Sequence, residues 1–314
     1  MRVGLIGAGG WGNNLARTLY ELGVLGGIAE LRPELRAQLA SLYPTVPLYP
    51  DGQHLLQSDI PAVAIATPAA THVALVREAL AAGKHVFVEK PLSLRREEAE
   101  ELADRADRDG RILMVGHLLL YQPAVRWIKD FLASGVIGVL YSLHQERLNL
   151  GRVRTVENAL WSLGVHDVAV LLYLVGEAPE RVIAQGQAVL QRGVEDDVYL
   201  HLRFPGGVQA HLHASWLWPE KRRRLTVIGS RTMLVYDEIA QEVTLHRKRI
   251  GEDLQPRDEG GEVVFRGAAQ PLRLEMEEFV ACVRDGRRPL SDGRQGVEVV
   301  AVLEEATRQL REAR

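Results

Sequence analysis

The N-terminus carries the pattern that most limits the fold: an apolar stretch, a glycine-rich turn and a helical pattern in direct succession. Residues 3–6 predict a strand, residues 7–12 read Gly-Ala-Gly-Gly-Trp-Gly, and apolar residues at helical spacing follow as far as Gly23. In a strand–GxGxxG–helix unit, the first glycine permits a tight turn, the second admits a pyrophosphate, and the third lets the helix pack on the strand. The helix N-terminus then faces the phosphates. The pattern predicts a dinucleotide site contacted by Gly7, Gly9, Gly10, Trp11 and Gly12.

The end of the second predicted strand bears on which dinucleotide is bound. Glu30 closes residues 24–29 and lies about twenty residues beyond the glycine turn, where a carboxylate accepts hydrogen bonds from the adenosine ribose. The same charge repels a 2′-phosphate, whereas Arg32 could accommodate one. We therefore expect NAD as the cofactor, with NADP as the alternative.

Strand and helix patterns alternate through the first 118 residues. Strands are predicted at 3–6, 24–29, 62–66, 85–89 and 112–115, and helices at 11–22, 33–41, 71–82 and 94–109. This alternation is typical of a parallel sheet covered by helices. Residues 1–118 are expected to form an NAD(P)-binding Rossmann domain in which Thr71 and Ser93 cap helix starts.

The pattern changes after residue 118. Helices are predicted at 124–134, 158–175, 272–285 and 294–311, and strands at 139–145, 181–190, 198–204, 207–214, 224–228, 232–236 and 242–247. The consecutive strands predict a meandering antiparallel sheet with hairpin turns at 205–207 and 229–230. Residues 251–267 are charged and glycine-rich and predict a surface loop. The fold class is α/β: a Rossmann domain, then an α/β domain over 119–314 with an open, mostly antiparallel sheet, whose last helix could pack back on the first domain.

The tripeptide Glu89-Lys90-Pro91 closes one of the predicted parallel strands. The chain has 38 lysines and arginines together, but the lysines are only those at 84, 90, 129, 221 and 248. A lysine at this place can be a solvated strand end. It can also stand beside a reacting hydroxyl and stabilise the alkoxide that forms, because an ammonium is a compact charge.

Composition excludes several classes of partner. The formal net charge of −3 and the pI near 6.4 do not indicate a surface that binds nucleic acid or an anionic membrane. No apolar run reaches the length of a membrane span, so we expect a cytoplasmic protein that binds small molecules. The one cysteine, Cys282, lies in a helical pattern and is expected to be a buried apolar residue.

Several motifs together resemble the Gfo/Idh/MocA oxidoreductases. They are Gly7-x-Gly9-x-x-Gly12, the Ala66-Thr67-Pro68 turn followed by His72, Glu89-Lys90-Pro91, Gly116, and Leu163-Gly164-Val165-His166. Residues 11–17, 147–152, 158–161 and 215–217 with Lys221 are similar to the branch of that family that includes UDP-N-acetylglucosamine 3-dehydrogenases. The resemblance implies that nicotinamide and substrate meet between the two domains.

The resemblance also implies roles for individual residues. The lysine of the family's motif orients the substrate hydroxyl and a histidine takes its proton; Lys90 and His166 match these positions. The family commonly has an aspartate four residues before the histidine, where this chain has Ser162. The implied contacts to the cofactor beyond the glycine turn and Glu30 are Arg32, Thr67, Pro68, His72, Glu89, Lys90 and His117.

The residues indicate the substrate less directly than they indicate the cofactor. The run Lys221–Arg224 is either a solvated face or a diphosphate site, since arginine forks suit phosphate. Arg147, Asn149, Arg154, Ser162 and Arg223 are further substrate-binding candidates beside Lys90, His166 and Lys221. We expect oxidation of a sugar or sugar-nucleotide hydroxyl, such as that at C3 of UDP-N-acetylglucosamine; a polyol or inositol dehydrogenase, or a sensor without turnover, are the alternatives.

Two further expectations concern the predicted antiparallel sheet. His211 and His213 share one face of a strand, but no third ligand stands at suitable spacing, so we expect packing on the sheet and no metal site. A broad exposed sheet face favours a homodimer or homotetramer.

Overall fold

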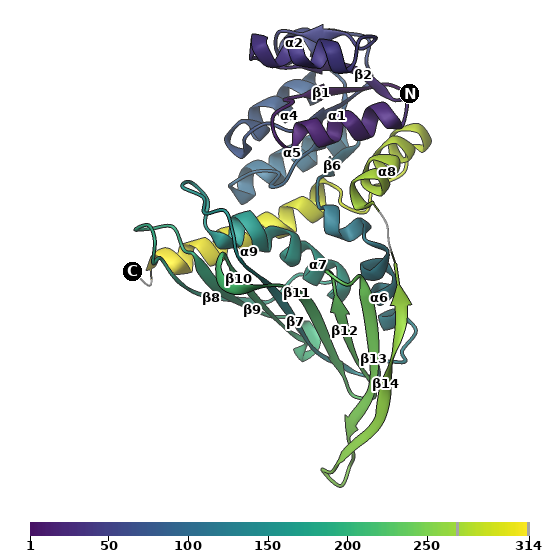
Figure 1. Ribbon diagram of the computed structural model, residues 1–314, viewed down its shortest axis with the longest axis vertical. Coiled ribbons are helices and arrows are strands. Elements are labelled where there is room, and N and C mark those ends of the chain that lie inside the picture. The colour runs from purple at the N-terminus through teal and green to yellow at the C-terminus, as the bar shows by residue number, and fades with distance from the viewer. Residues whose placement is uncertain (268–269, 313–314) are drawn as a thin grey trace. The chain divides into compact units, whose positions relative to one another are not determined.

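The computed structural model describes residues 1–267 and 270–312, which fall into two compact units (Figure 1). Unit 1 comprises residues 1–118 and 270–301, and unit 2 comprises residues 119–269 and the chain from Val302 onward. Residues 270–301 thus join unit 1, whereas the sequence-based division placed them in the second domain. They pack there through Phe279, whose ring centroid lies 5.9 Å from that of Phe87.

Unit 1 is built on the predicted parallel sheet. Its order is β3-β2-β1-β4-β5-β6, and every neighbouring pair of strands is parallel. The strands are β1 (Val3–Ile6), β2 (Leu25–Ala29), β3 (Leu48–Tyr49), β4 (Ala62–Ile65), β5 (His85–Val88) and β6 (Leu113–Val115). The strands β1, β4 and β6 are buried throughout, which explains why they read as continuous apolar runs.

Helices connect the strands of unit 1. They are α1 (Gly12–Glu21), α2 (Pro33–Leu42), α3 (Gly52–Leu56), α4 (His72–Ala81), α5 (Arg96–Arg108) and α8 (Pro271–Asp285), together with the first part of α9 (Gly293–Glu312) and the 3-10 turn η1 (Ala69–Thr71). The predicted caps differ in detail. The Thr71 hydroxyl bonds to Thr67 and Pro68 instead of capping α4, and Ser93 lies two residues before the N-cap of α5, accepting from the Arg95 N–H.

Parallel strands place their following turns at one edge of the sheet. The glycine turn follows β1, Ala66–Pro68 follows β4, Glu89–Pro91 follows β5, and Gly116 with His117 follows β6. The carboxyl ends of strands in such a sheet are where ligands bind. The motifs that are scattered in the sequence are therefore gathered within unit 1.

Unit 2 contains an eight-stranded sheet in the order β14-β13-β12-β11-β7-β10-β9-β8. The strands are β7 (Leu140–Leu150), β8 (Arg181–Gln187), β9 (Asp197–Arg203), β10 (Gln209–Ser215), β11 (Leu217–Gly229), β12 (Met233–Asp237), β13 (Glu242–Ile250) and β14 (Pro256–Arg266). All pairs are antiparallel except β7 with β10, which are parallel. The mostly antiparallel sheet is as predicted, and β7 inserts between β10 and β11 instead of continuing a meander.

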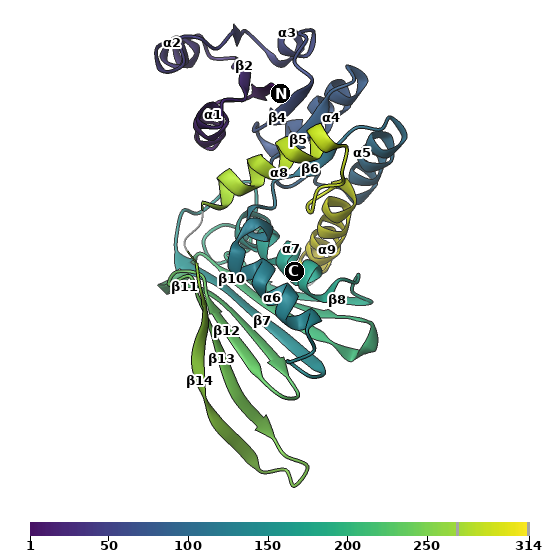
Figure 2. The ribbon, with the colours of Figure 1, turned by 90° about the vertical axis from the view of Figure 1, so that its right-hand side faces the viewer.

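The loop predicted over residues 251–267 is wrong. β14 pairs antiparallel with β13, and the two form the long ribbon at the edge of the sheet (Figures 1 and 2). Ion pairs such as Arg247 with Glu262 and Lys248 with Asp258 cross the ribbon. Most of β14 is exposed, so its side chains lack the alternation of apolar and polar residues from which a strand is predicted.

Helices pack on one face of the sheet of unit 2 (Figure 2). They are α6 (Pro123–Ala133), α7 (Val165–Val175) and the last part of α9, and the shorter turns of the unit are η2 (Leu118–Tyr121), η3 (Leu160–Gly164) and η4 (Pro205–Gly207). On α9, the Gln309 side chain bonds to the backbone of Val182 and Ala184 on β8. The predicted continuous helix over 158–175 is interrupted, because η3 is a π-helical turn that precedes α7.

Candidate functional site

The glycine turn has the geometry of a phosphate cradle. Gly7 has a φ of 87°, and a Cβ on Gly12 would lie 2.1 Å from the Gly7 carbonyl oxygen, so both positions require glycine. A Cβ on Gly10 would meet no atom within 4 Å. The turn is thus tight at its base and open at its crest, as a dinucleotide pyrophosphate requires.

Glu30 stands beside this turn and is almost fully buried. Its carboxylate accepts the Ala8 N–H at 3.0 Å and the Arg32 N–H at 3.1 Å, and it pairs with the Arg32 guanidinium at 2.8 Å. Burial raises the pKa of Glu30, but these hydrogen bonds outweigh it and hold the pKa below its usual value. Arg32 is therefore engaged by Glu30, which favours an ionised carboxylate toward a ribose over a cation toward a 2′-phosphate.

Trp11 connects the glycine turn to the Glu89-Lys90-Pro91 motif. Its indole N–H donates to Glu89 Oε1, and the Lys90 N–H donates to Glu89 Oε2 at 3.3 Å. Burial raises the pKa of Glu89 to about 7, against the opposing effects of Trp11 and Lys90. The side chain of Lys90 is half-buried. The motif is thus fixed to the cofactor turn by one indole and holds a cation at the sheet edge.

His72 holds the two neighbouring turns together. Its ring contacts the Pro91 carbonyl through Nδ1 at 2.7 Å and the Thr67 carbonyl through Nε2 at 2.9 Å. Burial lowers its pKa. The neutral ring donates to one of these two carbonyls and lies against the other, and Thr67 itself packs its methyl group against Gly7. Pro68 begins the turn η1 beside them.

His117 lies at the end of β6 and is fully buried. Neither of its ring nitrogens has a hydrogen-bond partner within the described ranges 1–267 and 270–312. Burial, with the charge of Lys90, lowers its pKa to about 3, so the ring is neutral. A neutral, unpartnered imidazole at this edge can donate one hydrogen bond and accept another.

Ser162 and His166 belong to unit 2, on either side of the junction between η3 and α7. Both are half-buried. Residues four apart lie on one face only in a regular α-helix. The π-helical turn breaks that register, and such turns are frequent at functional sites.

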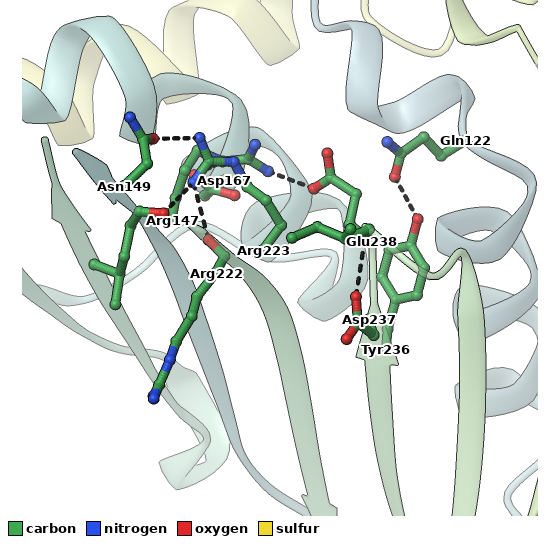
Figure 3. Close-up of polar contacts among 11 residues, drawn as sticks. Gln122, Arg147, Asn149, Asp167, Arg222, Arg223, Tyr236, Asp237 and Glu238 are labelled. Carbon is green, nitrogen blue, oxygen red and sulfur yellow. Dashed lines mark hydrogen bonds and ion pairs between the residues drawn. The ribbon is translucent and has the colours of Figure 1, made fainter. Parts of the chain in front are cut away.

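Arg147 lies in a buried network of charges instead of on an open surface (Figure 3). Its Nε donates to Asp167 Oδ2 at 2.5 Å and its Nη2 to Glu238 Oε2 at 2.7 Å. Burial raises the pKa of Asp167, and the Arg147 guanidinium opposes that rise. Arg223 lies nearby and donates to the Leu148 carbonyl at 2.9 Å.

The other residues predicted to bind substrate are Asn149, Arg154 and Lys221, and they differ in how exposed they are. Asn149 accepts from Arg223 Nη2 at 2.6 Å. Arg154 is exposed and pairs with Glu157 at 3.6 Å. Lys221 is exposed on β11. Within the run Lys221–Arg224, Arg223 is half-buried and the other three residues are exposed. Arg223 and Arg224 both line the small cavity beside Arg147.

His211 and His213 have separate partners on the sheet. His211 Nδ1 lies 2.7 Å from His201 Nδ1, and His213 Nε2 lies 2.6 Å from Asp197 Oδ1. Within the described part of the chain, no group of three or more metal-binding side chains has a geometry that could hold an ion. Cys282 is buried as predicted, and burial raises the pKa of its thiol to about 12.

Three acids were not predicted as part of either site: Asp167 and Glu275 are buried, and Glu238 is half-buried. Asp167 directly follows His166, and its position was the available signal. Glu238 joins Arg147 from 91 residues away, and Glu275 lies on α8, where burial and the charge of Glu89 raise its pKa. Neither has a local sequence pattern.

The glycine turn, the ribose-side carboxylate and the strand-end lysine define an NAD-binding oxidoreductase. Comparison with known proteins agrees. A family model described as "Oxidoreductase family, NAD-binding Rossmann fold" matches residues 1–117, and one described as "GFO/IDH/MocA C-terminal domain" matches residues 125–235. The chain belongs to this Gfo/Idh/MocA family and is a dehydrogenase of the class that acts on CH–OH groups.

Individual relatives support the family over the whole chain. UDP-N-acetylglucosamine 3-dehydrogenase from Acidithiobacillus ferrooxidans is 29% identical, covering 96% of this chain and 94% of that protein. Its structure aligns with a TM-score of 0.88 over 99% of this chain and 98% of that one. An oxidoreductase from Magnetospirillum magnetotacticum is 35% identical with a TM-score of 0.84, covering 96% and 98%. Inositol 2-dehydrogenase from Burkholderia multivorans is 31% identical over 56% of this chain and 55% of that protein.

Among the described residues, no helix combines the length and the apolar character needed to cross a membrane.

Proposed function

We propose that this protein oxidises a secondary hydroxyl of a nucleotide sugar, at C3 of a UDP-N-acetylglucosamine-like substrate, with NAD as the acceptor. The observation that carries the proposal is the full-length similarity to a UDP-N-acetylglucosamine 3-dehydrogenase, in sequence and in fold. The residues that match the family's catalytic motif, Lys90 and His166, are both present.

Lys90 and His166 divide the chemistry of the hydroxyl. The Lys90 ammonium orients the hydroxyl and stabilises the developing alkoxide, and His166 accepts the proton as the neutral imidazole. When bound, NAD supplies the acceptor for the hydride that leaves the same carbon. His117 is neutral and buried at the sheet edge, so it adds a hydrogen bond there without adding charge.

Residues of unit 1 hold the cofactor. We assign the pyrophosphate to the turn of Gly7, Gly9, Gly10 and Gly12, and the adenosine ribose to Glu30. Trp11, Arg32, Thr67, Pro68, His72 and Glu89 complete and support this site. The engagement of Arg32 by Glu30 supports NAD over NADP.

A diphosphate substrate needs cations in unit 2. Lys221 is exposed and is the member of the basic run that we assign to the diphosphate, with the exposed Arg154 and the half-buried Asn149 as further polar contacts. Arg147 and Arg223 are already engaged by Asp167, Glu238 and Asn149. The serine at position 162 favours a substrate other than a simple polyol.

One alternative remains. A polyol dehydrogenase is favoured by the similarity to an inositol 2-dehydrogenase. Ser162, where the family commonly has aspartate, does not favour it.

We also propose a homodimer or homotetramer formed through the sheet of unit 2, working in the cytoplasm. Tyr141, Ile183 and Tyr199 are exposed on this sheet at 54%, 37% and 43% of their surfaces. Exposed apolar faces of this kind are usually covered by a partner.

The decisive experiment is to mix the protein with NAD and UDP-N-acetylglucosamine and to follow absorbance near 340 nm. We expect NADH to form, and Lys221→Ala to raise KM about tenfold, because one charge-assisted hydrogen bond to phosphate is lost. Lys248→Ala, on the exposed ribbon, is the matched control. NADH from inositol but not from any UDP-sugar would establish the polyol alternative, and NADH from neither would contradict both proposed substrates.

A further inference from the structure

Asp167 is the residue next to the proposed base and is completely buried in the first turn of α7. It pairs with Arg147 on β7 at 2.5 Å, and Arg147 pairs in turn with Glu238 after β12 at 2.7 Å (Figure 3). Three elements of unit 2 are thus joined through one guanidinium. The connection ends one residue from His166.

The network is closed to substrate. The cavity that it lines, with Gln122, Gln145 and Tyr236, has a volume of about 10 Å³, which is close to the space that one water molecule occupies. Asp167 Oδ1 has no hydrogen-bond partner among residues 1–267 and 270–312. A single water molecule in this cavity can donate a hydrogen bond to that oxygen. A sugar or a phosphate does not fit.

The cations of the network have partners without a ligand. Arg147 pairs with Asp167 and with Glu238. Arg223 is tied to the Leu148 carbonyl and to the Asn149 side chain. Both guanidinium groups thus already donate to acceptors within the chain, which separates these residues from substrate recognition.

Helix α7 needs an anchor at the end where His166 stands. It follows the π-helical turn η3 directly, and its N-cap, Gly164, offers no side-chain hydrogen bond. A catalytic group must be held within about 0.5 Å and 10–20° of its productive position. A buried, charge-assisted pair in the first turn restricts both the rotation and the position of the helix.

We propose that Asp167, Arg147 and Glu238 are positioning residues that hold His166 in its catalytic orientation, and that Arg147 does not bind substrate. The proposal rests on the proposed role of His166 as the base. It adds an explanation of how the His166 side chain is held in place.

The first test compares Asp167→Asn and Glu238→Gln with Asp237→Asn. The control removes the same charge one residue from Glu238, where Asp237 bonds only to the nearby Ile239 and Ala240 N–H groups as far as the described contacts show. We expect kcat to fall at least tenfold in the first two variants, with KM and NADH affinity within about threefold of wild type, and no change in the control. Wild-type kcat in both network variants would overturn the proposal.

A second variant separates positioning from stability. Asp167→Asn combined with Arg147→Gln removes one charge of each sign, so the remaining Arg223 and Glu238 still balance and stability should return toward wild type. We expect kcat to remain low. Recovery of kcat together with stability would show that the network is only structural.

Crystal structures of wild type and of Asp167→Asn show the position of the His166 side chain without an activity measurement. We expect one ordered rotamer of His166 in wild type and a displaced or multiple one in the variant; an identical, ordered ring in both would refute the proposal. A wild-type protein that gives no NADH with any sugar refutes the proposed function instead, and the crystallographic comparison still decides the positioning role.

Discussion

The two units surround their acidic side chains differently. In unit 1, Glu89 and Glu275 are buried, and burial is the main cause of their raised pKa values. In unit 2, burial also raises the pKa of Asp167, but the guanidinium of Arg147, which Asp167 shares with the half-buried Glu238, opposes that rise. A buried acid can be compensated by a proton or by a fixed cation. The first solution makes a site sensitive to pH, and the second makes it rigid.

The largest effect should come from removing the fixed cation. Arg147→Met leaves Asp167 and Glu238 without their shared partner, and we expect the free energy of unfolding to fall by about 3–5 kcal/mol. Urea denaturation measures the loss. Arg203→Met is the control, because Arg203 and Glu180 form an exposed pair that should contribute less than about 1 kcal/mol. Equal losses in the two variants would contradict the comparison.

The raised pKa of Glu89 predicts that the free energy of unfolding falls as pH rises. The pKa of Glu89 is about 7 in the folded protein and 4.5 in its usual state. Between these values the folded state retains a proton that the unfolded state has released. Stability from this group is therefore complete below pH 4.5 and is lost as pH rises to about 7, by roughly 3 kcal/mol.

Glu89→Gln tests this prediction, since the amide keeps an acceptor for Trp11 and cannot titrate. Denaturation at pH 5 and at pH 8 should show a smaller difference for the variant than for wild type. Glu97→Gln, at an exposed position, should leave the difference unchanged. An undiminished pH dependence in Glu89→Gln would mean that the proton is held elsewhere.

Removing the two proposed catalytic groups should separate chemistry from stability. Lys90→Ala and His166→Ala should each lower kcat at least about 100-fold, or roughly 2.7 kcal/mol, because a positioned acid–base group is lost. NAD affinity should hardly change, as measured by NADH fluorescence. Near-normal turnover in either variant defeats the assignment, and Lys248→Ala again serves as the control.

The smallest expected effect concerns cofactor choice. Glu30→Ser removes a carboxylate close to the adenosine ribose, and the preference for NADH over NADPH should narrow by about 1 kcal/mol, or roughly fivefold. Fluorescence titration with both reduced cofactors measures the gap. Tighter binding of NADPH by wild type would show that Arg32 prevails over Glu30.

Local patterns were sufficient for most of unit 1. The alternation of apolar runs and helical patterns predicted its parallel sheet, and the glycine spacing predicted the tight turn at Gly7. Each signal lies within one strand–turn–helix unit, where backbone sterics and burial act over a few residues. The same reasoning missed β14, because an exposed ribbon held by crossing ion pairs has no apolar alternation.

Contacts between residues far apart in the sequence decide which charged residues of unit 2 pair with one another. Arg147 was predicted as a substrate ligand from its residue type, but the chain folds it against Asp167 and Glu238. The π-helical turn before α7 was likewise invisible, since its residues read as part of a continuous apolar helix. Neither feature leaves a periodic signal.

The sequence by itself determined the class of fold, the place of the cofactor turn and the identity of Lys90 and His166 as candidates for catalysis. Only the tertiary structure decided which charged residues are buried together, that Trp11 joins Glu89, and that Arg147 serves Asp167 and Glu238. The physical reason is the range of the interactions. Periodicity and turn chemistry act between near neighbours, whereas Arg147 meets its partners from 20 and 91 residues away, and such pairs exist only after the sheet has formed.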